Sequence, residues 1–235
     1  MKKYLMSMIL ELLIITMLCA CVGPQMTSKA SKFPLMYQET PVSILILPPI
    51  NESTAAEAKE YYSTTIQEPL AYSGYYTLPY PITSEILKME GIYDSELLVN
   101  LPLSKFREYF GADAVLFTTI KKWNMSYVVL ASNLTVSIEC VLKSTKSNQI
   151  LWKYTGTVVV DLSGGDSGNG IAGLIAKAIV TAINSAVADY VPYARQANYI
   201  ALSTIPYGKY NSQYNKDQQF QFIDQAPDLS ANNKQ

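Results

Sequence analysis

The feature that most constrains the fold is a run of alternating apolar and polar residues in the middle of the chain. From Leu134 to Leu142 every second side chain is apolar, and those between are mostly polar. Successive side chains of a strand point to opposite faces, so the pattern predicts a strand with one buried face. Residues 113–121 and 149–161 are predicted strands on either side, and their short links favour an antiparallel meander.

Shorter patterns before and after this region predict alternating strands and helices. Residues 42–47 are an apolar, β-branched run that ends at Pro48, which is typical of a buried strand, and residues 75–78 predict another. Thr54 and Glu57 have capping-box spacing at the start of the first helix. Helices are predicted over residues 54–70, 83–89, 103–110, 171–190 and 193–202. The fold class is therefore α/β, with a single mixed sheet and helices packed mainly on one face.

The two ends of the chain lack such periodicity. Residues 21–41 are rich in Pro, Ser, Thr, Lys and Gln and are predicted to be a flexible tether, reaching up to about 3.3 Å per residue. Residues 204–235 are polar and predicted to be disordered, because they offer little apolar surface to offset the entropy of ordering. The α/β domain is expected to occupy residues 42–203.

The amino-terminal 20 residues have the composition of an export signal. Lys2 and Lys3 precede an apolar stretch over residues 4–17, and small residues follow it. A spanning helix needs about 20 apolar residues, and Glu11 interrupts this shorter run. Residues 1–20 are therefore predicted to be a signal peptide and not a retained membrane span.

The signal ends in Leu18-Cys19-Ala20-Cys21, which resembles the lipobox of bacterial lipoproteins. The resemblance implies cleavage after Ala20 and attachment of lipid to Cys21, since cleavage before Cys19 would follow bulky Leu18. Two or three acyl chains would make attachment to a membrane effectively permanent. Val22 stands where Asp marks retention in the inner membrane, so the resemblance implies the periplasmic face of the outer membrane.

Composition excludes several classes of function. Removing the leader leaves 16 basic and 18 acidic residues, so no basic field for nucleic acid exists. The chain contains no histidine, which excludes a Ser-His-Asp triad and the commonest metal ligand. Cys140 is the one thiol left after lipidation and is expected to be buried and inert. No catalytic residue, cofactor or metal is predicted.

One motif resembles a nucleotide site but lacks its context. Residues 168–173 match G-x-G-x-x-G, yet no second parallel strand with an acidic residue follows the predicted helix. We interpret the motif as a flexible linker and a close-packed helix start. Two functions other than protein binding stay open. One is that of a solute-binding lipoprotein with a deep polar-lined pocket, and the other is that of a hydrolase with clustered carboxylates or a Ser-Lys pair.

Five short motifs occur in order between about Pro41 and Leu202. They are Ser43-Ile44-Leu45-Ile46-Leu47-Pro48-Pro49, Gly74-Tyr75-Tyr76, Phe110-Gly111-Ala112-Asp113-Ala114-Val115-Leu116, Ile120-Lys121-Lys122-Trp123 and Leu151-Trp152. This ordered set resembles a family of bacterial lipoproteins whose function is not assigned. Members are similar in fold to the amino-terminal domain of TolB and to the periplasmic part of the secretion channel CsgG.

The resemblance implies an α/β domain that acts by protein contact in the cell envelope. It suggests a CsgG-like lipoprotein as a partner, and a homodimer as one form of assembly. We therefore expect a non-enzymatic accessory lipoprotein that binds envelope proteins in assembly or export.

Overall fold

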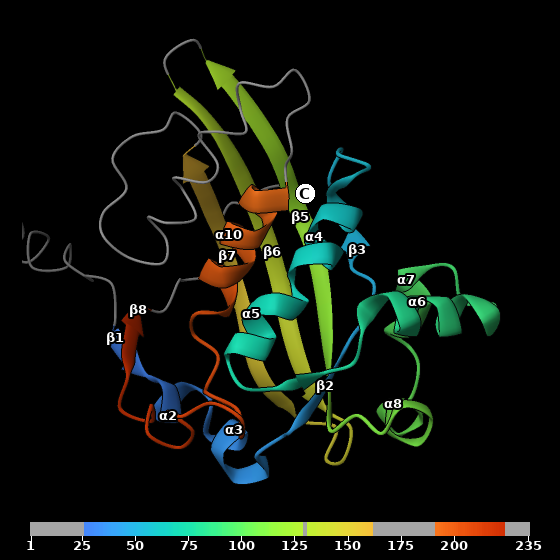
Figure 1. Cartoon of the computed structure of the whole chain (residues 1–235), viewed down its shortest axis with the longest axis vertical. Helices are drawn as coiled ribbons and strands as arrows, with labels where there is room; N and C mark the ends of the chain where they lie inside the picture. The colour runs from blue at the N-terminus through green and yellow to red at the C-terminus, as the bar shows by residue number, and fades with distance from the viewer. Residues whose placement is uncertain (1–25, 129–130, 162–190, 224–235) are drawn as a thin grey trace, which may run out of the picture.

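The computed structural model describes residues 26–128, 131–161 and 191–223 of the 235-residue chain. Within these residues, six strands form one mixed sheet with the order β4-β2-β5-β6-β7, and β3 also pairs with β5 (Figure 1). The strands are β2 (Ser43–Ile46), β3 (Ile50–Asn51), β4 (Tyr76–Thr77), β5 (Ala114–Val128), β6 (Ala131–Ser144) and β7 (Ile150–Asp161). A separate short ribbon pairs β1 (Met26–Ser28) with β8 (Gln221–Ile223).

The sheet joins a parallel half to an antiparallel half. β2 runs parallel to β4 and β5, whereas β5, β6 and β7 form the predicted antiparallel meander. The apolar positions of β6, from Leu134 through Cys140 to Leu142, are at most 1% exposed. The period-two pattern therefore identified both the strand and its buried face correctly.

One face of the sheet is covered by α4 (Ala58–Thr65), α5 (Gln67–Tyr72) and α10 (Val191–Leu202), as Figure 1 shows. Tyr62 of α4 and Ala197 of α10 belong to the same buried cluster as the apolar side of β5, β6 and β7. Trp123 and Trp152 also lie in this cluster, and they are 4% and 0% exposed.

Three further helices pack on the opposite face at the β2 edge: α6 (Tyr80–Met89), α7 (Ser95–Leu98) and α8 (Leu103–Phe110). They form a second, smaller core in which Leu87, Leu98 and Phe106 meet the alternate side chains of β2 and β5. The prediction of one mixed sheet with helices mainly on one face is confirmed. None of the described helices combines the length and apolar character needed to cross a membrane.

The first long helix begins later than the capping-box spacing of Thr54 and Glu57 predicted. α4 starts at Ala58, and no side chain caps its amino terminus. The Asn51 side chain accepts hydrogen bonds from the backbone N–H of Ser53 at 3.1 Å and from its hydroxyl at 2.6 Å. This local turn holds the residues before Ala58 out of the helix, and the capping box of Thr54 and Glu57 does not form.

The structure corrects the prediction of a flexible tether. Residues 26–39 form β1, α2 (Lys29–Lys32) and α3 (Pro34–Glu39). Phe33 and Met36 of this segment are buried in the main core. The elements are only three to six residues long, too short to show a period, and single apolar side chains anchor them. The signal peptide and Cys21 lie outside the described residues.

The predicted disorder of the carboxyl-terminal segment is also wrong, as far as residue 223. Ile205 and Asp217 are buried, and β8 pairs with β1. Gly74 has φ +92°, and a Cβ at Gly74 would collide with Asn211, whereas one at Gly208 would collide with Gly74. Close backbone contact therefore packs this segment onto the body. Residues 224–235, the helix predicted over residues 171–190 and the glycine motif at 168–173 lie outside the described residues.

Candidate functional site

The most distinctive exposed surface lies on α6. Ile82, Ile86 and Met89 are 59%, 40% and 79% exposed, and their spacing of four and three residues aligns them on one side of the helix. We call these three residues the α6 apolar stripe. Thr83 and Leu87 face the second core and are buried. α6 is therefore apolar on two sides, of which its own domain covers one.

Local sequence explains why a helix forms here and where it ends. Pro79 precedes α6 and Pro81 lies in its first turn, where proline is compatible with a helix. Gly91, with φ +80°, follows its end. Farther along the chain, Tyr93 and Leu97, the latter in α7, are also 74% and 53% exposed. An uncovered group of large apolar side chains is typical of a surface that contacts another molecule.

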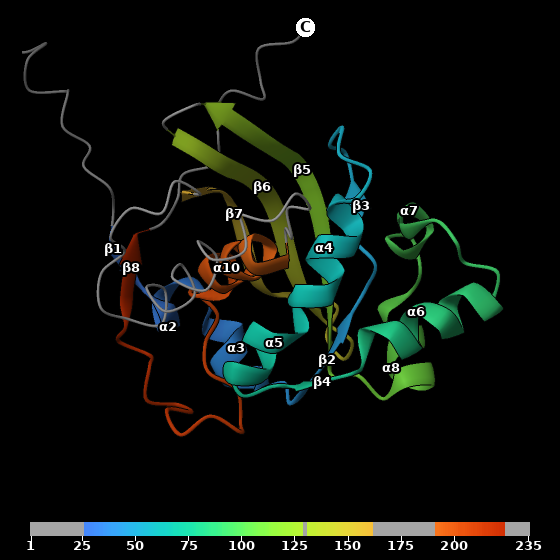
Figure 2. The ribbon, with the colours of Figure 1, turned by 45° about the horizontal axis from the view of Figure 1, so that its top comes forward.

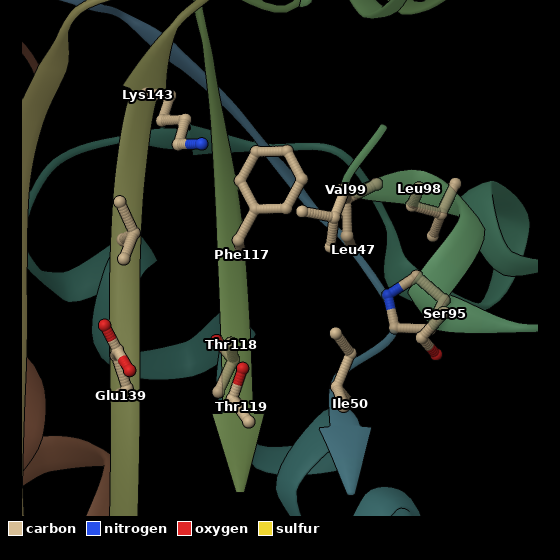
Figure 3. Close-up of a pocket in the computed structure, with 12 residues that line it drawn as sticks. Leu47, Ile50, Ser95, Leu98, Val99, Phe117, Thr118, Thr119, Glu139 and Lys143 are labelled. Atoms are coloured by element: carbon tan, nitrogen blue, oxygen red, sulfur yellow. The ribbon is translucent and has the colours of Figure 1, made fainter. Parts of the chain in front are cut away.

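A cavity of about 180 Å³ lies between α7 and the strands β5 and β6 (Figure 3). Solute-binding sites usually measure about 300–1,000 Å³. The walls of the cavity are mainly apolar and include Leu47, Leu98, Val99 and Phe117. The volume is too small for the deep pocket that the solute-binding alternative requires.

The charged groups around this cavity are already engaged. Glu139 pairs with Lys153 at 2.7 Å, and the Lys143 amine lies 5.2 Å from the centre of the Phe117 ring, toward which it extends in Figure 3. Ser95 is buried, and its hydroxyl has no hydrogen-bond partner among the described residues. One unpaired hydroxyl does not supply the convergent polar groups that recognise a solute.

Cys140 lies in a buried polar cluster on the covered face of the sheet. Its Sγ is 3.7 Å from both the Tyr62 hydroxyl and the Thr118 hydroxyl, which are 2.8 Å apart. Burial raises the pKa of the Cys140 thiol to about 11, because it disfavours the thiolate. The thiol is therefore buried and protonated at neutral pH, as the sequence predicted.

We expect Cys140 to resist alkylation in the folded protein. With a thiol pKa of about 11, on the order of one molecule in a thousand carries a thiolate at pH 8, and that fraction rises about tenfold per pH unit up to the pKa. Iodoacetamide labelling followed by mass spectrometry should be slow in buffer and fast in urea. Equal rates in the two conditions would contradict the buried position.

Among the described residues, the Lys29 amine and the Glu39 carboxylate both take part in structural contacts. Lys29 Nζ donates to the Ile205 carbonyl at 2.7 Å and to Asp217 at 3.1 Å, so its nearest partners include no serine hydroxyl. Glu39 accepts hydrogen bonds from the hydroxyls of Ser144 and Ser147, each at 2.6 Å. These contacts fasten the two ends of the chain and α3 to the body. Among the described residues no three metal-binding side chains converge.

Sequence reasoning identified a helix at residues 83–89 but missed the exposed stripe. The signal was present, since Ile82, Ile86 and Met89 repeat at helical spacing, and Leu87 of the same helix adds an apolar side chain outside that row. A helix with an apolar arc wider than one packing face indicates a second contact surface. The predicted lipidation site, Cys21, is not among the described residues.

Comparison with known proteins gives a family match over most of the chain. Residues 33–207 match the family described as "Putative lipoprotein GNA1162-like". The lipoprotein NMB1124/NMB1162 of Neisseria meningitidis is 29% identical over 152 residues, which cover 65% of this chain and 70% of that protein. Neither name indicates an enzymatic activity.

Two solved structures are also similar. The crystal structure of lipoprotein GNA1162 from Neisseria meningitidis has 30% identity and a TM-score of 0.49, covering 62% of this chain and 100% of that one. The PelC dodecamer from Paraburkholderia phytofirmans has 12% identity and a TM-score of 0.39, covering 70% and 88%. At these TM-scores the structural similarities carry no conclusion about function. The family match over residues 33–207 shows that the chain belongs to the GNA1162-like lipoproteins.

Proposed function

We propose that this lipoprotein is anchored to the periplasmic face of the outer membrane and acts, without catalysis of its own, as an accessory factor that binds envelope proteins in assembly or export. Membership of a lipoprotein family and the lipobox ending at Cys21 support the anchor. The observation that carries protein binding is the α6 apolar stripe, which its own domain leaves uncovered.

The chemistry of the stripe defines the partner it fits. Ile82, Ile86 and Met89 present a narrow apolar row, while Glu85 and Lys88 on the same helix are exposed and paired with each other at 3.6 Å. An apolar groove or the apolar side of a partner's helix would bury this row. We propose a CsgG-like lipoprotein as the partner, following the family resemblance, with a homodimer as the second form of assembly.

The anchor is tested with two cysteine variants. Cys21→Ser should abolish acylation and release the protein from sedimenting envelopes, because no acyl chains then hold it. Cys19→Ser is the matched control and should leave processing unchanged, since Cys19 leaves with the signal peptide. Mass spectrometry of the mature amino terminus and fractionation of outer membranes measure both effects. Unaltered processing and sedimentation of Cys21→Ser would refute the anchor.

Protein binding is tested on α6 with a matched control on α10. Ile86→Asp should reduce recovery of the partner by about tenfold or more, because the charge would be buried in the contact. Ile200 is 40% exposed, like Ile86, and Ile200→Asp should leave recovery unchanged. Co-purification from gently solubilised native membranes measures the difference, and circular dichroism checks folding. Recovery of the wild-type protein alone, or equal losses in both variants, would count against the proposal.

A further inference from the structure

The β1–β8 ribbon joins the two ends of the described chain at one side of the molecule, opposite α6, α7 and α8 (Figures 1 and 2). Met26 pairs with Ile223 and Thr27 pairs with Phe222. Because successive strand residues alternate between faces, Met26 and Ile223 share one face of the ribbon and Phe222 lies on the other. The ribbon is therefore two-sided.

The inner side of the ribbon is fastened to the main core. The ring of Phe222 stacks on Phe33, with centroids 5.8 Å apart and planes within 3°, and Phe33 in turn contacts Trp152. Just beyond β1, the backbone N–H of Lys29 donates to the Phe220 carbonyl at 3.0 Å. The ribbon is thus held against the main core.

Large apolar side chains are exposed at the ribbon. Met26 and Ile223 lie on its outer face with the polar Ser28 and Gln221, and Phe220 comes just before β8. Met26, Phe220 and Ile223 are 56%, 66% and 54% exposed. We call these three residues the ribbon end. Exposed apolar side chains of this size are typical of a contact surface, and contact with another phase would bury them.

Chain length restricts what can cover the ribbon end. Met26 follows Cys21 by five residues, which span at most about 17 Å when fully extended. A tether reaching to residue 41 would instead have allowed roughly 65 Å. If Cys21 carries lipid, Met26 cannot leave the immediate neighbourhood of the bilayer.

We infer that the ribbon end rests on the bilayer surface, with Met26, Phe220 and Ile223 inserted at the boundary between headgroups and acyl chains. The inference rests on the proposed acylation of Cys21. Short apolar faces of this kind bury about 5–10 Å into that boundary. The body is then held in one orientation, and α6 lies on the side of the molecule away from the ribbon.

The test places a fluorescent label on the ribbon end of the full-length acylated protein. Phe220→Cys is labelled with an environment-sensitive dye after reconstitution into phosphatidylethanolamine–phosphatidylglycerol vesicles that contain no other protein. Cys140 is buried and does not compete for the dye. Tyr109→Cys on α8 is the matched control, because Tyr109 is an aromatic residue that is 71% exposed on the opposite side of the molecule.

We expect nitroxide-bearing lipids to quench the label at residue 220 roughly twofold or more and to leave the label at residue 109 unchanged. Iodide in the water phase should give the reverse pattern. A label at residue 220 that iodide quenches fully, on a protein shown by mass to be acylated, would overturn the inference alone. Shielding of residue 220 that appears only when other envelope proteins are added would overturn it in favour of a protein contact. An amino terminus without acyl chains would overturn the proposed function as well.

Discussion

Lys29→Ala is expected to lower the free energy of unfolding by about 3–5 kcal/mol, because it leaves a buried carboxylate without its cation. The side chains of Lys29 and Asp217 are 4% and 2% exposed, and their charged atoms are 3.1 Å apart. Asp217 also accepts hydrogen bonds from the Tyr37 hydroxyl at 3.1 Å and from the Tyr207 N–H at 2.9 Å. The pair therefore joins the amino-terminal and carboxyl-terminal segments, and both should loosen together.

A surface pair provides the control for Lys29→Ala. Lys105 and Glu108 are closer, at 2.9 Å, but their side chains are 49% and 60% exposed. Lys105→Ala should therefore leave the free energy of unfolding almost unchanged, since water screens an exposed pair. Urea titration measures both variants, and limited proteolysis of the terminal segments reports the loosening. Equal losses of unfolding free energy in the two variants would show that burial does not determine how strongly the Lys29–Asp217 pair stabilises the protein.

A double variant separates the ion pair from the hydrogen bonds around it. Lys29→Met with Asp217→Leu removes both charges, and buried pairs replaced in this way are often neutral in stability. Here the Tyr37 hydroxyl and the Tyr207 N–H lose their acceptor, which costs about 1–3 kcal/mol for each group left unsatisfied in the interior. We therefore expect the double variant to regain only part of the free energy of unfolding that Lys29→Ala loses.

The same pair explains why the order of residues 26–39 and 204–223 was not predicted. Lys29 and Asp217 are separated by 188 residues, and each looks in sequence like an ordinary surface charge. β1 and β8 contain three residues each and pair across nearly the whole chain. Local periodicity cannot reveal an element that short, and pairing over that distance leaves no pattern in either partner. Their order comes from tertiary contact.

The central sheet was predictable because its signals are local. β6 alternates from Leu134 to Leu142, and β2 is an apolar run stopped by Pro48, so each pattern fits one kind of strand. The covered face follows from the same alternation, which placed Cys140 in the interior. The α6 apolar stripe was predictable only in part. Its spacing is visible in the sequence, but its exposure depends on which side of α6 the second core covers. Lipidation of Cys21 remains a sequence-based proposal.

Trp152→Ala is expected to have the largest effect of any single substitution in the main core, about 3–5 kcal/mol. Trp152 is 0% exposed and is stacked on Tyr154, with ring centroids 6.4 Å apart. It also contacts Phe33 from the amino-terminal segment, and its Nε1–H donates to the Thr204 hydroxyl at 3.2 Å. Loss of the indole would leave a cavity at the point where three distant segments meet.

Two controls on this strand and at this position separate packing from other causes. Val159→Ala alters a residue of β7 that is 61% exposed and should change stability by less than about 0.5 kcal/mol. Trp152→Phe keeps an aromatic ring but removes the hydrogen bond to Thr204. Its loss of stability should therefore lie between those of Val159→Ala and Trp152→Ala. Thermal and urea unfolding measure the series. If Trp152→Ala were no worse than Val159→Ala, the amino-terminal segment would not depend on this core, and Phe33 could not fasten the β1–β8 ribbon to the sheet.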